Sequence, residues 1–461
     1  MDRAARVGVV TLSYVGMCSL EPHVNQFRLL VKRRFAPFFC TQALGAFNDN
    51  AFRNALVMLV AFHLGLGDHT VALYTNLAPA LFILPFFLFS ATAGQLAEKY
   101  EKSRIIRYVK LFEIGAMALA LFGFYTHNVG LLLTVLFLMG MHSATFGPIK
   151  YAILPQALQH GELIGGNALV ETGTQLAMLL GLIVGSALIE VGSAGTLWAG
   201  TVTLSLAVLG YLASRQIPLA PATAPTLKLH WNPLAETVRV LAITRGDRAV
   251  FHAVLGISWY WFYATVLIAQ LPNYTRLNLG GDGSVAILVL TLFSIGTGVG
   301  ALLCERLSAR RVEIGLVPLG ALGLAVFGID LYFARPGLAL QQNMDWLAFV
   351  HGAGSVRIAL DLALIGMFAG IYVVPLFAFI QQRTPSDRLS RVIAGNNIIN
   401  ALLICTGAGF GLGMDALGLG VPQTFLLAAV FGVLFVGFIF VRVPEFVARF
   451  AGWARLDRRR S

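Results

Sequence analysis

Charged residues are scarce in this sequence. Asp, Glu, Lys and Arg make up 12% of its 461 residues, against about 25% in ordinary soluble domains. Cysteine is scarce as well, and the four cysteines are scattered without the CxxC spacing of zinc sites. Neither a disulfide framework nor a metal site is therefore expected. The shortage of charge excludes a soluble globular enzyme.

Apolar residues fill the whole length of the chain. Hydrophobic residues make up 57% of it, with 48 glycines and 33 phenylalanines. A membrane span needs about 20 mostly apolar residues, and glycine lets such helices approach closely. The pattern predicts an all-α integral membrane protein. Its twelve spans are expected near residues 36–65, 72–96, 105–126, 130–149, 164–190, 195–213, 249–271, 284–304, 312–333, 359–380, 393–416 and 422–442.

Basic residues predict the orientation, because Lys and Arg in short loops are retained in the cytoplasm. The formal net charge is +11, but no soluble basic domain suggests nucleic-acid binding. With both termini in the cytoplasm, all but four of the 33 Lys and Arg lie in cytoplasmic segments or at the span ends beside them. We therefore expect a cytoplasmic N-terminal extension at residues 1–34, rather than a signal peptide, and a basic cytoplasmic tail at residues 444–461.

The chain contains an internal repeat. The loop between spans 2 and 3 has a small residue, then an acid followed by a base, and an arginine six residues after the acid. The loop between spans 8 and 9 repeats this pattern 207 residues later, and residues 148–167 resemble residues 375–396. Two six-helix halves are therefore expected, at residues 35–213 and 248–443, joined by a central cytoplasmic loop at 214–247. This architecture resembles the major facilitator superfamily, and such repeats are typical of transporters.

The repeated loop is a candidate gate. It resembles the cytoplasmic loop motif of that superfamily, with Glu98 for the usual Asp and no Gly before Arg104. An acid and a base at a helix end can pair with the opposite half when the cytoplasmic side is shut and separate when it opens. The alternative is a loop that is basic only because it is cytoplasmic. The gating candidates are Glu98, Lys99, Arg104, Glu305, Arg306 and Arg311.

Span 1 is more polar than a membrane helix usually tolerates, since each central charge costs roughly 2.5–3.5 kcal/mol on insertion scales. Asp49 and Arg53 are four residues apart and can meet on one face, which Asn50 and Asn54 extend. Counted from Phe35, Asp49 lies about 21 Å along the span, past the cytoplasmic half of the bilayer. These residues predict a polar path through the membrane. The alternative is a structural ion pair that locks span 1 to a neighbour.

The charges inside the membrane are concentrated in the N-terminal half. Under the repeat, Lys150 aligns with Phe377 and Glu171 with Asn400. Span 7, the equivalent of span 1, is aromatic and uncharged at residues 258–263. This asymmetry suits an amphipathic substrate, with charges for a polar head on one side and an apolar surface for a tail on the other. For Lys150, a topogenic charge at the end of span 4 is the alternative.

Four stretches of the chain carry a more specific resemblance. Residues 39–50, 146–155, 165–171 and 304–307 resemble the lysophospholipid transporter family of the major facilitator superfamily, particularly the transporter half that is fused to acyl-ACP-dependent acyltransferases. The resemblance extends from about Phe35 to Val441. Together with the polar residues above, it implies a substrate path lined by Asp49, Asn50, Arg53, Asn54, Lys150, Asn167 and Glu171.

The resemblance also implies a function. Proteins of this family move lysophospholipids, chiefly lysophosphatidylethanolamine, across the bacterial inner membrane to the cytoplasmic leaflet, where an acyltransferase restores the missing chain. The sequence up to Ser461 contains no acyltransferase domain, so such a partner is expected either as a separate polypeptide or beyond this sequence. We expect a monomeric transporter that works by alternating access, without a cofactor, a metal, a nucleic acid or an enzymatic activity.

Two other functions are alternatives. A proton-driven exporter of amphipathic drugs or another small solute would take up its proton at Asp49 or Glu171. An integral membrane acyltransferase is suggested only by the spacing of His63 and Asp68, without the companion motifs of such enzymes. His142, which lies inside span 4, is interpreted as a packing residue.

Overall fold

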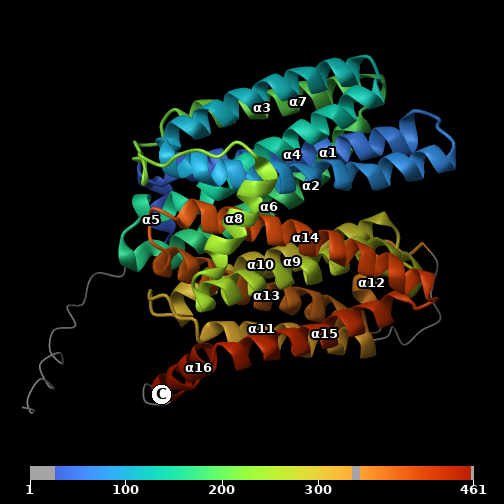
Figure 1. The fold of residues 1–461 in the computed structure, drawn as a ribbon. Coiled ribbons are helices and arrows are strands. Elements are labelled where there is room, and N and C mark those ends of the chain that lie inside the picture. Colours follow the sequence, from blue (N-terminus) through green and yellow to red (C-terminus); the bar gives the residue numbers. More distant parts are fainter. Residues whose placement is uncertain (1–25, 335–342, 353, 458–461) are drawn as a thin grey trace, which may run out of the picture.

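The computed structural model describes residues 26–334, 343–352 and 354–457. In this part of the chain the helices and their connections account for the whole fold, and the long helices lie side by side along one axis (Figure 1). The long helices before the central segment are α1 (Ala36–Met58), α2 (Asp68–Lys99), α3 (Lys102–Tyr125), α4 (Val129–Ala152), α6 (Leu163–Ile189) and α7 (Gly195–Ser214). Those after it are α9 (Arg248–Tyr274), α10 (Gly283–Leu307), α11 (Leu316–Phe333), α13 (Ser355–Arg383), α14 (Leu389–Ala416) and α15 (Val421–Arg442).

Short helical elements connect the long helices. The α-helical ones are α5 (Leu154–Ala157), α8 (Pro233–Arg245), α12 (Trp346–His351) and α16 (Glu445–Asp457). The 3-10 turns are η1 (Gln26–Val31), η3 (His160–Glu162) and η4 (Gly192–Ala194). Two π-helical turns, η2 (Leu59–His63) and η5 (Thr275–Leu279), extend α1 and α9, which are the first long helices of the two groups.

The long helices agree with the predicted membrane fold. In the described residues, ten helices are long and apolar enough to cross a membrane. The other two predicted spans are α1 and α3, of 23 and 24 residues, which carry polar and charged residues along their length. Because α1 packs along α6 and α3 packs along α7, both belong to the bundle of membrane helices.

The two groups of helices repeat the same pairings. In the first group α1 packs on α6, α2 on α4 and α3 on α7. In the second group α9 packs on α14, α10 on α13 and α11 on α15. The groups meet where α2 contacts α14 and where α6 contacts α10, which are also equivalent pairs. The internal repeat in the sequence therefore corresponds to a repeat in the packing.

Glycine allows the closest of these crossings. A Cβ on Gly140 of α4 would lie 2.3 Å from the carbonyl oxygen of Phe82 on α2. A Cβ on Gly366 of α13 would lie 2.1 Å from the carbonyl oxygen of Phe293 on α10. Both distances are far below van der Waals contact, so a residue with a side chain would push these helices apart.

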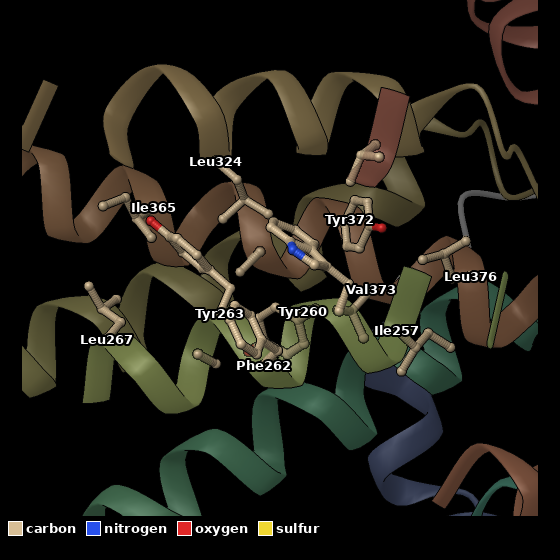
Figure 2. Close-up of a cluster of buried hydrophobic side chains, with 14 of the residues drawn as sticks. Ile257, Tyr260, Phe262, Tyr263, Leu267, Leu324, Ile365, Tyr372, Val373 and Leu376 are labelled. Carbon is tan, nitrogen blue, oxygen red and sulfur yellow. The ribbon is translucent and has the colours of Figure 1, made fainter. Parts of the chain in front are cut away.

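The second group of helices has a core of aromatic residues. Tyr260 and Tyr263 of α9 and Tyr372 of α13 are at most 2% exposed and pack with Leu324 of α11 and Ile365 of α13 (Figure 2). Apolar and aromatic packing thus joins α9, α11 and α13 in this cluster.

The central segment, predicted as a loop, contains α8. Asn232 accepts hydrogen bonds from the first backbone N–H groups of this helix, which begins with Pro233, a combination that favours helix initiation. The segment is also bound to the bundle where α2 ends and α3 begins, since the backbone N–H of Lys102 donates to the carbonyl of Ala220 at 2.9 Å. We call this end of the bundle the basic end, because Lys99, Lys102 and Arg104 lie there.

Both ends of the described part of the chain contact the basic end. Gln26 Nε2 donates to the carbonyl of Leu302 at 3.1 Å, and Trp453 Nε1 of α16 donates to the carbonyl of Leu307 at 2.9 Å. The predicted basic tail is thus largely a helix packed against α11. Residues 1–25 of the predicted N-terminal extension and residues 458–461 of the tail lie outside the described residues.

Candidate functional site

A cavity of about 380 Å³ lies between the two groups of helices. Its first wall comes from α1, α2, α4 and α6, and its second wall comes from α9, α13 and α14. The two walls differ in charge, because all acidic, basic and histidine side chains of the lining belong to the first wall. These are Asp49, Arg53, His142, Lys150 and Glu171.

Asp49 lies in the second half of α1, which ends at Met58, and faces α4. Ser143 donates a hydrogen bond from its Oγ to Asp49 Oδ2 at 2.6 Å. The other carboxylate oxygen, Oδ1, is buried and has no hydrogen-bond partner in the described part of the chain. Asp49 therefore carries an acceptor into the cavity wall that the protein itself leaves unused.

The sequence spacing allows an ion pair between Arg53 and Asp49, but the described part of the chain does not contain it. The Nη2 of Arg53 donates instead to Asn50 Oδ1 at 2.5 Å, and its guanidinium lies 6.0 Å from the centre of the Phe82 ring. Asn54 donates to the carbonyl of Asn50 at 2.9 Å and is not part of the cavity lining. Three of the four polar residues predicted on α1 thus face the cavity.

Lys150 links three helices of the first wall. Its Nζ donates to Thr174 Oγ1 on α6 at 2.8 Å, and Thr174 lies 3.0 Å from Gln42 Oε1 on α1. Lys150 also lies 5.3 Å from the centre of the Tyr151 ring. Lys150 therefore lies in the cavity wall and in the last turn of α4, a place that is also compatible with the alternative of a topogenic charge.

Glu171 lines the same wall, from α6. Its side chain is 5% exposed, and its Oε1 accepts a hydrogen bond from Gln175 Nε2 at 3.0 Å. Gln175 is uncharged, and the basic side chain that interacts electrostatically with Glu171 is Lys150 of the same wall.

A buried charge cluster, which shares His142 with the cavity lining, was missed by the sequence analysis. Glu113 Oε2 lies 2.6 Å from Lys110 Nζ and 3.2 Å from His142 Nε2. Its Oε1 accepts from Asn48 Nδ2 at 2.8 Å. All four residues are at most 3% exposed, and a Cβ on Gly45 would lie 2.6 Å from Lys110 Nζ. The signal that could have revealed the cluster is the pair of charges at i and i+3 within predicted span 3.

The second wall of the cavity is mainly apolar. Besides Thr265, this wall contributes the side-chain amides of Asn397 and Asn400. Asn400 accepts a hydrogen bond from Ser258 at 2.7 Å. The residues of this wall are Trp261, Thr265, Phe377, Asn397, Asn400, Ala401 and Ile404. The predicted asymmetry is therefore an asymmetry of charge, with hydrogen-bonding groups on both sides.

Aromatic stacking forms the floor of the cavity toward the basic end. The rings of Tyr151 on α4 and Phe377 on α13 stack with their centres 4.0 Å apart and an angle of 3° between their planes. Asn397 of α14 lies close to Gly147 of α4, where an added Cβ would be 2.4 Å from Asn397 Nδ2. These contacts join α4 of the first group to α13 and α14 of the second group.

Asn167, expected among the headgroup residues, lies between the two groups of helices and outside the cavity lining. Its Nδ2 donates to Gln381 Oε1 at 2.6 Å, and Gln381 Nε2 donates back to Asn167 Oδ1 at 3.1 Å. Both residues are buried, at 2% and 4% exposed. This reciprocal amide pair connects α6 to α13 and makes Asn167 a candidate for closure rather than for headgroup binding.

Glu98 makes a second connection between the two groups. Its side chain is fully buried, and its Oε2 accepts from Arg391 Nε of α14 at 2.6 Å. Its Oε1 accepts from the backbone N–H of the same residue at 3.0 Å. An acid of the repeated loop is thus held at the start of a helix from the opposite group.

Glu305, the equivalent acid of the second loop, also lies against the opposite group. Its carboxyl carbon is 3.4 Å from the position of a Cβ on Gly165 of α6, and its Oε1 is 3.7 Å from Arg310 Nε. The remaining gating candidates form no ion pair within the part of the chain that the structure describes; these are Lys99, Arg104, Arg306 and Arg311.

Comparisons with known proteins agree with this geometry. The sequence profile of the Major Facilitator Superfamily matches residues 38–408. The chain is similar to the lysophospholipid transporter LplT of Serratia proteamaculans, at 26% identity over 380 residues that cover 80% of this chain and 84% of the relative. It is also similar to LplT of Citrobacter koseri, at 26% identity over 410 residues that cover 84% of this chain and 92% of the relative.

Solved structures share the fold. The human organic anion transporter MFSD10 superposes with a TM-score of 0.70 at 14% identity, covering 88% of this chain and 99% of that one. The fucose:proton symporter FucP of E. coli superposes with a TM-score of 0.65 at 16% identity, covering 89% and 99%. Because the superfamily profile spans most of the chain and these folds agree, the chain belongs to the Major Facilitator Superfamily and is a membrane transporter, not an enzyme.

Proposed function

We propose that this chain transports lysophospholipids, with lysophosphatidylethanolamine as the expected substrate, across the bacterial inner membrane to the cytoplasmic leaflet. In this proposal the basic end and both termini face the cytoplasm, and the two halves move by alternating access. The names of the similar transporters support the substrate class. The observation that carries the proposal is the cavity. Its acidic, basic and histidine side chains all belong to the first wall, and the opposite wall is mainly apolar.

The first wall suits a zwitterionic headgroup. The unused Oδ1 of Asp49 can accept from an ammonium group, and Glu171 offers a second carboxylate nearby in the lining. Arg53 and Lys150 can donate to the phosphate, since a guanidinium has five N–H donors and an ammonium has three. Such charge-assisted hydrogen bonds replace the hydration that the headgroup loses inside the membrane.

The second wall suits the start of an acyl chain. Trp261, Phe377 and Ile404 present apolar surface opposite the charges. The cavity volume of about 380 Å³ is at the lower end of the ~300–1,000 Å³ of small-molecule sites, which favours a bound headgroup with the chain extending between the halves. A single chain gains about 0.8 kcal/mol per buried CH₂, so it is expected to stay in apolar surroundings throughout transport.

The contacts at the basic end suit a state in which the cytoplasmic side is shut. In the proposed cycle, the Glu98–Arg391 contact and the Asn167–Gln381 pair separate when the headgroup is released toward the cytoplasm. Glu305 and Gly165 separate in the equivalent place. An acyltransferase on a separate chain would then reacylate the product, and the transporter acts as a monomer.

Reconstituted vesicles test the proposal. The purified chain should move fluorescent lysophosphatidylethanolamine between leaflets several-fold faster than empty vesicles do, and should not move the diacyl lipid at that rate. Glycerophosphoethanolamine, which has the same headgroup without a chain, separates lipid transport from solute transport. An imposed pH gradient tests the alternative of a proton-driven exporter. Transport of a water-soluble drug that depends on the gradient, without movement of the lysolipid, would favour that alternative.

A further inference from the structure

The helix α8 has one buried face and one exposed face that is apolar. Glu236, Val240 and Thr244 recur every four residues, and each is at most 1% exposed. The opposite face carries Trp231, just before the helix, with Leu234 and Val238. These are 70%, 73% and 69% exposed. Three large, exposed apolar side chains on one side of a short helix form a contiguous patch, and such patches mark surfaces that contact a partner or a membrane.

The buried face of α8 joins the two groups of helices. Val240 belongs to a small apolar cluster with Ala91 of α2 and with Ala394 and Ile398 of α14. A Cβ on Gly395 of α14 would lie 2.2 Å from Thr244 Oγ1. Figure 1 shows α8 crossing the long helices at a steep angle between α2 and α14. The helix therefore lies on the side of the bundle, over the line where the halves meet.

The position of α8 along the bundle corresponds to the membrane surface. With 32 and 28 residues, α2 and α14 are about 48 and 42 Å long, so they extend beyond a hydrocarbon core of about 30 Å by about 6–9 Å at each end. Ala91 and Gly395 lie about 12 and 9 Å from the basic ends of their helices. The helix α8 is thus within a few ångströms of the boundary between hydrocarbon and headgroups.

The charges around the exposed face are basic. Arg239 and Arg245 are exposed, and Lys228 precedes the helix in the same segment. The one acidic residue of the helix, Glu236, is buried and pairs with Arg239 at 3.0 Å. Tryptophan prefers the membrane interface, and an apolar helix face flanked by Lys and Arg is typical of helices that lie in the surface of an anionic bilayer.

We propose that the exposed face of α8, formed by Trp231, Leu234 and Val238, binds the anionic lipid surface of the leaflet at the basic end. A lipid surface fits better than a partner protein, because the patch lies at the depth of the headgroup boundary and has basic rather than mixed charge around it. Since the other face of α8 spans α2 and α14, lipid bound there anchors the helix across the junction of the halves. This inference does not depend on the transported substrate.

Fluorescence quenching tests the inference. The native Cys18, Cys40 and Cys405 are replaced by serine, Leu234 is replaced by cysteine and labelled with an environment-sensitive fluorophore, and the full chain is placed in nanodiscs that contain phosphatidylglycerol. Lipid with a nitroxide near its headgroup should quench the label, and aqueous iodide should quench it several-fold less than a label at Ser386→Cys. Ser386 is the matched control, since it is exposed in the α13–α14 connection at the same end.

Three outcomes would overturn the inference. Iodide quenching at position 234 as strong as at position 386 would mean that the face lies in water. Protection from both quenchers would mean that another protein or a second copy covers it. Equal nitroxide quenching in nanodiscs of phosphatidylcholine alone would mean that the anionic lipid has no part in binding.

Discussion

Asp49 and Arg53 show how the residues of the cavity differ from a structural ion pair. Each has its own neutral partner, Ser143 for Asp49 and Asn50 for Arg53. A helix that only needed to neutralise two charges would pair them directly, because isolated charges are costly inside a membrane. We propose that their separation leaves both side chains available to a ligand with two opposite charges.

Glu113 illustrates the contrasting case of a charge that holds the structure. Replacing Glu113 by Gln removes the ion-pair partner of the buried Lys110, so we expect a loss of about 3–5 kcal/mol of stability. Thermal unfolding in detergent measures the loss. The control is Glu190→Gln, whose side chain is 57% exposed beside His63 and should contribute at most about 1 kcal/mol. Equal unfolding temperatures for the two variants would contradict a structural role for the cluster.

Glu162 predicts a pH dependence near the start of α1. Burial raises the pKa of Glu162, but hydrogen bonds from Arg34 at 2.6 Å, from the Gln159 N–H at 2.9 Å and from Lys32 at 3.3 Å lower it below its ordinary value of 4.5. The contribution of these contacts is therefore present above about pH 4.5 and is lost as the pH falls through the lowered pKa. The wild type should be more stable than Glu162→Gln at neutral pH, and this difference should shrink near pH 3. A stability difference that stays constant across this range would show that the ionisation of Glu162 does not contribute to stability.

At the scale of helices, the close crossings at Gly140 and Gly366 predict that an added methyl group destabilises the two halves equally. Gly140→Ala and Gly366→Ala both place a methyl group against a backbone carbonyl, so each should destabilise the protein by about 1–3 kcal/mol. Gly115→Ala in α3 is the control, because its added Cβ meets nothing within 4 Å, and it should stabilise by about 0.4–1 kcal/mol. Thermal unfolding of the three variants tests the pairing, which fails if Gly115→Ala is as harmful as the other two.

We expect that weakening the Glu98–Arg391 contact between α2 and α14 opens the basic end of the cavity. Glu98→Gln removes the charge from two hydrogen bonds to Arg391, and bonds to charged groups contribute about 1.5–3 kcal/mol. We expect an Asn397→Cys reporter in the cavity to react at least about tenfold faster with an impermeant thiol reagent added at the basic end. The control is Glu313→Gln, whose carboxylate caps a turn at Gly315 in the α10–α11 connection. An unchanged rate in Glu98→Gln would mean that this contact does not close the basic end.

For the whole molecule, the sequence was sufficient to predict the spans and the repeat. Hydropathy, basic loops and matched motifs predicted twelve spans in two halves, and the structure has the equivalent helix pairs. The polar α1 was also predicted as a span, in spite of its charged residues. The alignment of Lys150 with Phe377 also predicted that charge would be confined to one side of the cavity.

Contacts between distant parts of the chain could not be predicted in the same way. Asn167 and Gln381 are 214 residues apart, and their pairing depends on how the two halves meet. His142 was interpreted as a packing residue because its partner Glu113 lies on another helix. The helix α8 had a local signal, Asn232 before Pro233, but the prolines around it favoured a loop.

Transport by an Asp49 variant tests the central claim most directly. In vesicles that contain equal amounts of folded protein, Asp49→Asn should slow the movement of lysophosphatidylethanolamine at least about tenfold, because the ammonium loses a charge-assisted hydrogen bond of about 1.5–3 kcal/mol. The matched variant Asp68→Asn changes an exposed acid at the start of α2 and should transport at the wild-type rate. Undiminished lysolipid transport by Asp49→Asn would contradict the account.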